Sequence, residues 1–347
     1  MSVKRVLLAE PRGFCAGVEK AIKALAWMVR IFEPPVYCYH EIVHNQHVVD
    51  QFRAQGVIFV DDISEVPAGA PLMLSAHGSA PEVVAAARAK GRVVVDAVCP
   101  LVTKVHHELK VRAKKGYTVL YVGHQGHEEA VGTMAVAPAS VHLIERTEDL
   151  DAIDPASSPF ALLSQTTLSF DEWADLKEHA IERFPDLWMP NRSDLCFATT
   201  NRQSALREIA EIADAVVVIG SANSSNTVAL TEVARASGCD RVYRVNSAQE
   251  LPGGLGGVVG VTAGASAPDA LVAEVIEALA PSRGVETMVV TEEDEYFPPP
   301  PELRELLRAV ALALGVLCDV PEAPGDPVAD DRETEASTVL TGTAAVP

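Results

Sequence analysis

Short runs of apolar residues alternate along the chain with longer segments in which apolar residues recur at helical spacing. The short runs have the length of buried strands, and the longer segments have the periodicity of amphipathic helices. Regular alternation of strands and helices is typical of α/β folds with parallel sheets. The predicted strands cover residues 6–9, 72–74, 93–95, 119–122, 141–144, 160–163, 216–219 and 258–261.

Three of the helix-like segments follow a cysteine that stands in a short turn. The segments are 16–22, 102–115 and 202–213, and the cysteines are Cys15, Cys99 and Cys196. This repeated setting divides the chain into three α/β modules of similar length. The predicted parts are the N-terminal strand with module 1 (1–97), module 2 (98–195), module 3 (196–284), a C-terminal segment and helix (285–320) and a tail (321–347).

The C-terminal end differs from the rest of the chain in composition. One helical face is predicted from Leu303, Leu306, Leu307, Val310 and Leu314. The segment 321–347 is rich in Pro, Asp, Glu, Thr and Ala and has little apolar periodicity. Because such a segment cannot bury enough apolar surface to fold, we expect a disordered acidic tail there.

Charge and hydropathy exclude several classes of function. The formal net charge of −20 disfavours general binding to nucleic acid or anionic membranes, which relies on clustered Lys and Arg. No apolar stretch approaches the roughly 20 residues that a membrane span needs, so a cytoplasmic protein is expected. The 6 cysteines at wide, irregular separations favour reduced thiols or metal ligands over a disulfide framework.

Polar loops follow five of the predicted strands. In an open α/β sheet, ligands bind beyond the carboxyl ends of the strands. Any one of these loops alone would be an ordinary turn or helix cap, whereas five together predict a shared polar cavity. The loops are 75–79, 123–129, 164–167, 220–227 and 262–268.

Small hydroxylic residues in two of these loops are suited to a phosphate. Ser224, Ser225, Asn226 and Ser266 stand near helix starts, where backbone N–H groups bind anions without Lys or Arg.

Histidines could add charge-assisted bonds to the same anion. His44 and His77 are the candidates, and a bound anion would favour their protonated forms. The competing explanation for each is a capped or core imidazole.

A second group of residues could transfer protons. Glu129 follows His127 in a Gly-containing turn and is a candidate proton donor, and the hydroxyls of Thr166 and Thr167 could relay a proton or orient a substrate hydroxyl. A solvated loop acid is the alternative for Glu129.

The three helix-start cysteines suggest an incomplete metal site. A helix N-terminus lowers the pKa of a thiol and so favours the thiolate that metals bind. Three thiolates could hold a [4Fe–4S] cluster with one iron free for a substrate oxygen, or a zinc ion that keeps a water. Three buried core cysteines would give the same spacing, and the residues alone leave these alternatives open.

Taken in order, the motifs resemble one family, the 4-hydroxy-3-methylbut-2-enyl diphosphate reductases (LytB/IspH), over about residues 4–305. The matching segments are PRGFCAGV at 11–18, EIVHN at 41–45, SAHG at 75–78, DAVCPLVTKVH at 96–106, SQTTLS at 164–169, CFATTNRQ at 196–203, NSSN at 223–226 and GASAP at 264–268. Each is modest alone, but their order is specific.

The resemblance implies a fold and a cofactor. It implies a trefoil of three α/β modules, related by a pseudo-threefold axis, around one central [4Fe–4S] cluster held by Cys15, Cys99 and Cys196. The implied reaction is reductive removal of the hydroxyl of (E)-4-hydroxy-3-methylbut-2-enyl diphosphate. Its products are isopentenyl and dimethylallyl diphosphate, in the last step of the non-mevalonate (MEP/DXP) isoprenoid pathway. The electron donor would be of the ferredoxin or flavodoxin type.

The resemblance also assigns roles to the remaining candidates. Glu129 would deliver protons, with Thr166 orienting the substrate hydroxyl and Thr167 in support. The implied diphosphate ligands are His44, His77, Ser224, Asn226 and Ser266, with Ser225 and His127 nearby.

A few positions depart from the family pattern. Val98 stands where the family usually has Thr, and Val131 where it usually has an acid, which leaves the polarity around Cys99 and Glu129 open. No role is assigned to the extension after about residue 306, and Cys38, Cys239 and Cys318 are expected to be ordinary apolar residues.

Two other functions remain as alternatives. One is a zinc-dependent phosphate-ester hydrolase that uses His127, Glu129 and one or more cysteines. The other is a non-catalytic iron–sulfur sensor of isoprenoid diphosphates.

Overall fold

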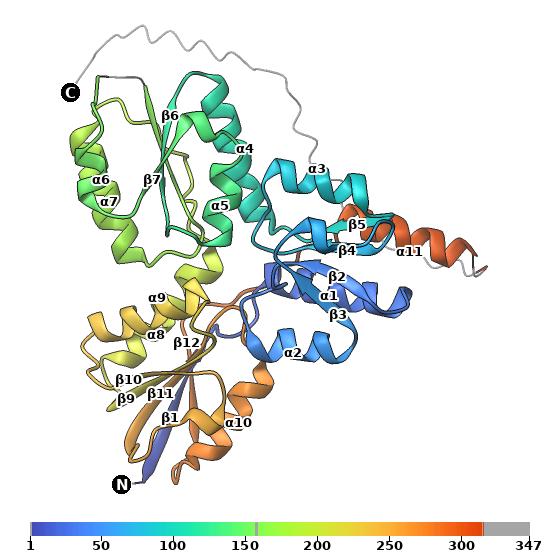
Figure 1. Ribbon diagram of the computed structural model, residues 1–347. Helices are drawn as coiled ribbons and strands as arrows, with labels where there is room; N and C mark the ends of the chain where they lie inside the picture. The colour runs from blue at the N-terminus through green and yellow to red at the C-terminus, as the bar shows by residue number, and fades with distance from the viewer. Residues whose placement is uncertain (1, 157–158, 314, 316–347) are drawn as a thin grey trace, which may run out of the picture. The chain divides into compact units, whose positions relative to one another are not determined.

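The computed structural model describes residues 2–156, 159–313 and 315. The predicted tail, Leu314 and Cys318 lie outside these residues. The chain divides into two compact units, Met1–Glu305 and Leu306–Pro347. Within the first unit, the strands form three separate sheets with helices beside them (Figure 1). Strand pairings in all three sheets are parallel, which confirms the predicted α/β class.

The largest sheet has five strands in the order β10-β9-β11-β1-β12. Its strands are β1 (Val3–Glu10), β9 (Ala215–Ile219), β10 (Val242–Val245), β11 (Gly257–Ala263) and β12 (Val285–Val289). The other two sheets have the orders β3-β2-β4-β5 and β7-β6-β8. Their strands are β2 (Val36–Tyr39), β3 (Val57–Val60), β4 (Pro71–Leu74), β5 (Val93–Asp96), β6 (Thr118–Val122), β7 (Val141–Ile144) and β8 (Phe160–Ser164).

Helices flank all three sheets (Figure 1). The helices of the first half of the chain are α1 (Ala16–Ile31), α2 (Gln46–Ala54), α3 (Pro81–Lys90), α4 (Pro100–Lys114), α5 (Glu128–Met134) and α6 (Thr147–Asp151). Those of the second half are α7 (Phe170–Arg183), α8 (Phe197–Ala210), α9 (Ser225–Ala236), α10 (Asp269–Leu279) and α11 (Pro301–Ala313). Single 3₁₀ turns lie at Ile63–Glu65, Pro138–Ser140 and Ala248–Glu250.

Strand β9 shows why the apolar runs are uninterrupted. Val217 and Ile219 pack with residues of α10 on one face of the sheet, and Val216 and Val218 pack with residues of α8 and α9 on the other. Because helices cover both faces, every position of the strand is buried.

Each sheet takes most of its strands from one part of the chain. The four-stranded sheet falls within 1–97 and the three-stranded sheet within 98–195. The five-stranded sheet takes β9, β10 and β11 from 196–284 and adds β1 and β12 from outside that range. The N-terminal strand, grouped with module 1 in the sequence, therefore pairs with strands of the third sheet.

The predicted C-terminal helix is present as α11. Leu303 on it is buried, whereas Leu312 is 73% exposed. Among the described residues, no helix has both the length and the apolar character that crossing a membrane requires.

Candidate active site

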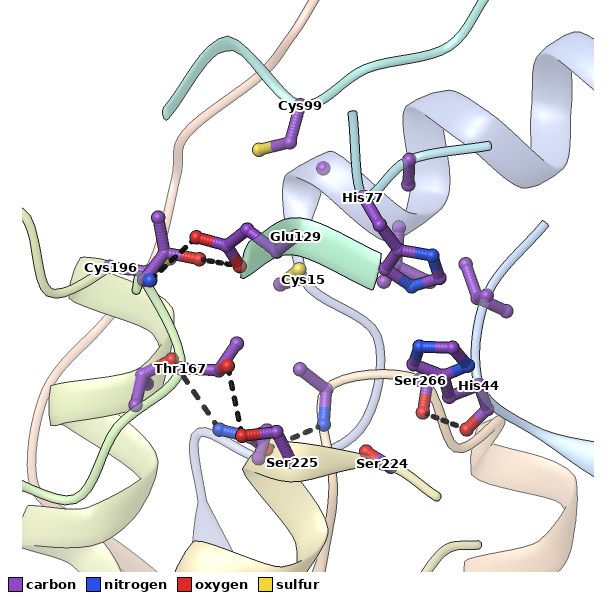
Figure 2. Close-up of a pocket in the computed structure, with 18 of the residues that line it drawn as sticks. Cys15, His44, His77, Cys99, Glu129, Thr167, Cys196, Ser224, Ser225 and Ser266 are labelled. Atoms are coloured by element: carbon purple, nitrogen blue, oxygen red, sulfur yellow. Dashed lines mark hydrogen bonds between the residues drawn. The ribbon is translucent and has the colours of Figure 1, made fainter. Parts of the chain in front are cut away.

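Cys15, Cys99 and Cys196 occupy equivalent positions at the starts of three helices. They are the N-cap residues of α1, α4 and α8, and none of them uses its side chain as a cap. All three are free thiols and line one cavity, which Glu129 lines as well (Figure 2).

The backbone holds each cysteine in the same way. The N–H of Cys15 donates to the carbonyl of Ala265, that of Cys99 to Ala76, and that of Cys196 to Thr166. Each acceptor lies in a loop that follows a strand, namely β11, β4 and β8. The loops at the carboxyl ends of the three sheets therefore place the three thiols.

Gly17 lies where a side chain would fill the space between two of these thiols. A Cβ atom on it would lie 2.8 Å from Sγ of Cys99 and 3.9 Å from Sγ of Cys15. The two sulfurs thus approach one point from different helices. Convergent thiols are the donors that hold iron–sulfur clusters, so the residues present fit such a group, although zinc also takes thiolates.

The pKa values of two of the thiols differ from the expectation for helix starts. Burial, together with the neighbouring thiols, raises the pKa of Cys99 and the pKa of Cys196 to about 12. Backbone N–H groups of the first helical turn act in the opposite direction but are outweighed. Helix position alone therefore does not make these groups thiolates, and it is the binding of a metal that lowers the pKa of such thiols.

Glu129 is a buried acid bonded to Thr166. Its Oε1 accepts from the backbone N–H of Thr166 at 2.7 Å, and its Oε2 accepts from Oγ1 of Thr166 at 2.9 Å. Burial raises the pKa of Glu129 to about 7, and the two bonds from Thr166 limit the rise. The side chain is 2% exposed, which excludes the solvated loop acid considered above. A carboxyl with this pKa can both hold and release a proton near neutral pH.

Three histidines form another side of the cavity. The rings of His44 and His77 stack with centroids 3.9 Å apart, and His127 meets His44 edge-on at 5.6 Å (Figure 2 shows the stacked pair). Burial lowers the pKa of His44 and lowers the pKa of His127 to about 3, and neighbouring histidines add to both effects. These two imidazoles are therefore neutral near pH 7 until an anion lies beside them.

Two acids orient the histidines. Nδ1 of His77 lies 2.7 Å from Oε2 of Glu128, and Nδ1 of His44 lies 3.4 Å from Oε2 of Glu41. Burial alone would raise the pKa of Glu128, but the hydrogen bond with His77 and the other histidines lower it to about 2. Glu128 therefore stays ionised beside His77.

The N-terminus of α9 and the loop of Ser266 complete the cavity. Ser224 caps α9 by accepting from the N–H of Thr227, and Ser225 opens the helix. Oγ1 of Thr167 donates to Oγ of Ser225 at 3.1 Å, and Oγ of Ser266 donates to the carbonyl of His44 at 2.9 Å. Loops after all three sheets thus meet at one polar wall with free helix N–H groups.

Comparison with known proteins identifies the family. The LytB protein family model matches residues 6–280. A 4-hydroxy-3-methylbut-2-enyl diphosphate reductase from Rhodopirellula baltica is 46% identical over 319 residues, which is 90% of this chain and 100% of that protein. The chain belongs to the 4-hydroxy-3-methylbut-2-enyl diphosphate reductase (LytB) family. It is therefore an oxidoreductase, and the resemblance of the motifs is confirmed.

Solved structures of reductases agree with the fold. The E-1-hydroxy-2-methyl-but-2-enyl-4-diphosphate reductase from Plasmodium falciparum has a TM-score of 0.85 and 30% identity, covering 89% of this chain and 99% of that one. Another, described as (E)-4-hydroxy-3-methyl-but-2-enyl diphosphate reductase, the terminal enzyme of the non-mevalonate pathway, has a TM-score of 0.59 and 28% identity, covering 80% and 99%.

The structure brings together every site residue that the sequence proposed. Cys15, Cys99 and Cys196 share the cavity with Glu129, Thr166, Thr167, His44, His77, His127, Ser224, Ser225, Asn226 and Ser266. Of the remaining cysteines, Cys38 and Cys239 are buried elsewhere.

Several contributing residues were not singled out from the sequence. Gln165 donates to both Thr167 and Ser225, and Thr199 accepts from Asn226 at 3.5 Å. Gly17 and Glu128 were missed as well. All four stand next to or near a proposed residue in the chain, and Gly17, Gln165 and Thr199 lie within the matching motifs, but nothing in the sequence marked them individually.

The two departures from the reductase family pattern leave the cavity intact. Val131 is 55% exposed and does not line it. Val98 contributes its backbone carbonyl, which accepts from Nζ of Lys20 at 2.8 Å, so this contact does not depend on its side chain.

Proposed function

We propose that this chain removes the hydroxyl of (E)-4-hydroxy-3-methylbut-2-enyl diphosphate by two-electron reduction. Isopentenyl and dimethylallyl diphosphate are the products, at the terminal step of the non-mevalonate pathway. The cofactor is one [4Fe–4S] cluster held by Cys15, Cys99 and Cys196. The observation that carries this proposal is one cavity with three convergent thiols, a buried acid of pKa near 7 and a polar wall of helix N–H groups.

Cys15, Cys99 and Cys196 would hold the cluster, which would supply electrons one at a time and an iron without a cysteine ligand that could act as a Lewis acid. The overall change consumes two electrons and two protons. One proton leaves with the hydroxyl as water, and the other ends on a carbon of the allylic product. None of the residues that line the cavity is exposed, which limits the access of bulk water to this chemistry.

The diphosphate binds at the wall formed by α9, Ser266 and the histidines. Ser224, Ser225 and Asn226 start a helix whose unpaired N–H groups and dipole favour an anion. His44 and His127 gain protons as the anion arrives and form charge-assisted bonds to it, and His77, stacked on His44, faces the same anion. This end of the substrate therefore lies opposite the thiols.

Glu129 supplies the proton for the departing hydroxyl. Its carboxyl faces the cavity on the side of the cysteines, and Thr166 holds both of its oxygens. The hydroxyl of Thr166 also orients the substrate hydroxyl toward that carboxyl, and Thr167 supports the wall through Ser225. Each turnover then requires Glu129 to be protonated again from the substrate side or from water.

The decisive experiment combines metal analysis with turnover. Anaerobically purified protein should contain iron and acid-labile sulfide and absorb near 400 nm, as iron–sulfur proteins do, with about four irons per chain for one cubane. With a reduced dye it should convert the hydroxylated diphosphate to both products. A colourless zinc protein would support the hydrolase instead, and binding without consumption would support a sensor.

Binding of an anion should be coupled to proton uptake. Because burial lowers the pKa of His44 and His127, a diphosphate must raise these pKa values when it binds, and affinity should fall as pH rises. Calorimetry with inorganic pyrophosphate in buffers of different ionisation enthalpy measures the protons taken up.

His44→Asn tests that linkage. It should reduce the proton uptake and weaken pyrophosphate about tenfold to a hundredfold, the effect of one charge-assisted bond. The exposed His142 of β7 provides the control His142→Asn. Equal proton uptake by the wild type and by His44→Asn would show that His44 is not part of the anion site.

The electron donor and the location of the protein complete the proposal. A ferredoxin or flavodoxin is the expected donor, and the cytoplasm is the expected location. The donor is tested by comparing turnover driven by photoreduced flavodoxin or ferredoxin with turnover driven by a reduced dye. The location is tested by fractionation of cells.

A further inference from the structure

Each of the three helices that begins at a cysteine carries a basic residue in its second turn. These residues are Lys20 on α1, Lys104 on α4 and Arg202 on α8. In a helix of a globular protein such a charge usually faces solvent. Here all three side chains instead reach a segment far away in the chain.

Lys20 bonds to the turn that precedes Cys99. Its Nζ donates to the carbonyl of Val98 at 2.8 Å. Burial lowers the pKa of Lys20, and Cys99 and Asp96 beside it raise that pKa again. The helix that starts at Cys15 therefore holds the turn of the second cysteine.

Lys104 bonds to the turn that precedes Cys196. Its Nζ lies 3.0 Å from Oδ1 of Asp194 and donates to the carbonyls of Arg192 at 3.2 Å and Ser193 at 3.3 Å. The side chain of Asp194 is 1% exposed. The helix that starts at Cys99 therefore holds the turn of the third cysteine.

Arg202 bonds to the turn that precedes Cys15. Its Nε and Nη2 donate to the carbonyl of Gly13 at 3.1 and 2.9 Å, and Nη2 also donates to the carbonyl of Phe14 at 3.3 Å. Its Nη1 donates to Glu293 and to the carbonyl of Ala198 in the first turn of α8. With a side chain 1% exposed, Arg202 ties the turns of the third and the first cysteine together.

We propose that Lys20, Lys104 and Arg202 form a closed ring of positioning residues for the cluster site. Each cation sits on the helix of one cysteine and holds the turn of the next, in the order 15, 99, 196 and back to 15. Hydrogen bonds from a charged donor are stronger than neutral ones and hold a turn in one geometry. The ring holds three thiols from distant segments of the chain in fixed positions relative to one another. This inference rests on the proposed function, because it requires that the three thiols bind one cluster.

The direction of the ring gives each variant a distinct signature. Holoenzyme of Lys20→Met, Lys104→Met and Arg202→Met is incubated anaerobically with an iron chelator and iodoacetamide, and alkylation of each cysteine is followed by peptide mass spectrometry. In Lys20→Met, Cys99 should be alkylated first. In Lys104→Met the first cysteine should be Cys196, and in Arg202→Met it should be Cys15. The favoured cysteine should label about tenfold faster than in wild type, the effect of losing a hydrogen bond to a charged group.

Matched controls lie on the same three helices. The control residues are Lys23, Lys110 and Arg207, none of which holds a cysteine turn. Lys23 pairs with Glu19, Arg207 pairs with Asp171, and Lys110 is exposed. The Met variants of these control residues should lose iron at the wild-type rate, and their cysteines should be alkylated at the wild-type rate. Conservative variants Lys20→Arg, Lys104→Arg and Arg202→Lys keep the charge and should restore much of the protection, and they also carry the test if a Met variant fails to fold.

Two results separate the ring from the proposed function. Wild-type protein without iron would contradict the proposed function, whatever the variants do. Wild-type protein with iron, together with ring variants whose three cysteines label in the wild-type order, would overturn the ring. Uniform acceleration of all three cysteines would likewise indicate general destabilisation rather than a directed contact.

Discussion

Cys196→Ala is expected to abolish turnover and to remove most of the bound iron. The three thiols reach one cavity from three helices, and among the residues lining it they are the only thiols. Two thiolates cannot hold a cubane that already lacks a fourth cysteine ligand. Cys15→Ala and Cys99→Ala should behave in the same way. Iron and sulfide content, the visible spectrum and dye-driven turnover, each measured after anaerobic reconstitution, check this result.

The chain supplies its own matched controls. Cys38 is buried in β2 and Cys239 is 3% exposed, and neither lines the cavity. Cys38→Ala and Cys239→Ala should therefore retain full iron content, with at most the modest loss of thermal stability that a small core cavity causes. Full cluster content in Cys196→Ala would show that the cavity thiols are core residues, which is the alternative that spacing alone left open.

Strand β9, which the sequence predicted, is covered on both faces. The run of β9 is apolar throughout because α10 packs on one side and α8 and α9 on the other. Strand β12 was missed because four of its five residues are exposed, so it has no apolar signature. Strands β2, β3 and β10 were missed as well, although with four residues each they are as long as β4, β5 and β7, which the sequence predicted.

The site was predictable where its chemistry lies in local motifs. Cysteine at a helix start and polar residues after a strand are visible in short segments, and their ordered combination carried the family resemblance. The contacts between segments were not visible. Arg202 and Gly13 are separated by 189 positions, and only the fold shows that this arginine is buried rather than a surface charge.

Burial explains the one electrostatic expectation that was wrong. A helix N-terminus does lower the pKa of an exposed thiol, but Cys99 and Cys196 are removed from water and face other thiols. The same removal from water raises the pKa of Glu129, where it serves the reaction by keeping a proton available near neutral pH. The position of a residue at a helix start predicts in which direction the helix dipole shifts its pKa. Burial in the cavity decides whether the pKa is raised or lowered in the end.

Glu129→Gln is expected to keep the cluster and lose turnover about a hundredfold to ten-thousandfold, the usual contribution of a general acid. Glutamine preserves the size of the side chain and can accept one bond from Thr166, but it cannot deliver a proton. Iron content and the visible spectrum should match wild type, so that the defect lies in proton transfer. The exposed Glu148 of α6 provides the control Glu148→Gln, which should keep wild-type activity.

The pH dependence of turnover distinguishes proton delivery from a structural role. The acid form of Glu129 is present below its pKa of about 7 and is lost as pH rises through that value, so wild-type kcat/KM should fall on the alkaline side. The histidines add a decline in the same direction, and they remain in the variant. The residual activity of Glu129→Gln should therefore show a shallower decline above pH 7, measured with reduced methyl viologen, whose potential does not depend on pH. A decline of equal steepness in both proteins, or full activity in Glu129→Gln, would assign the proton to another group.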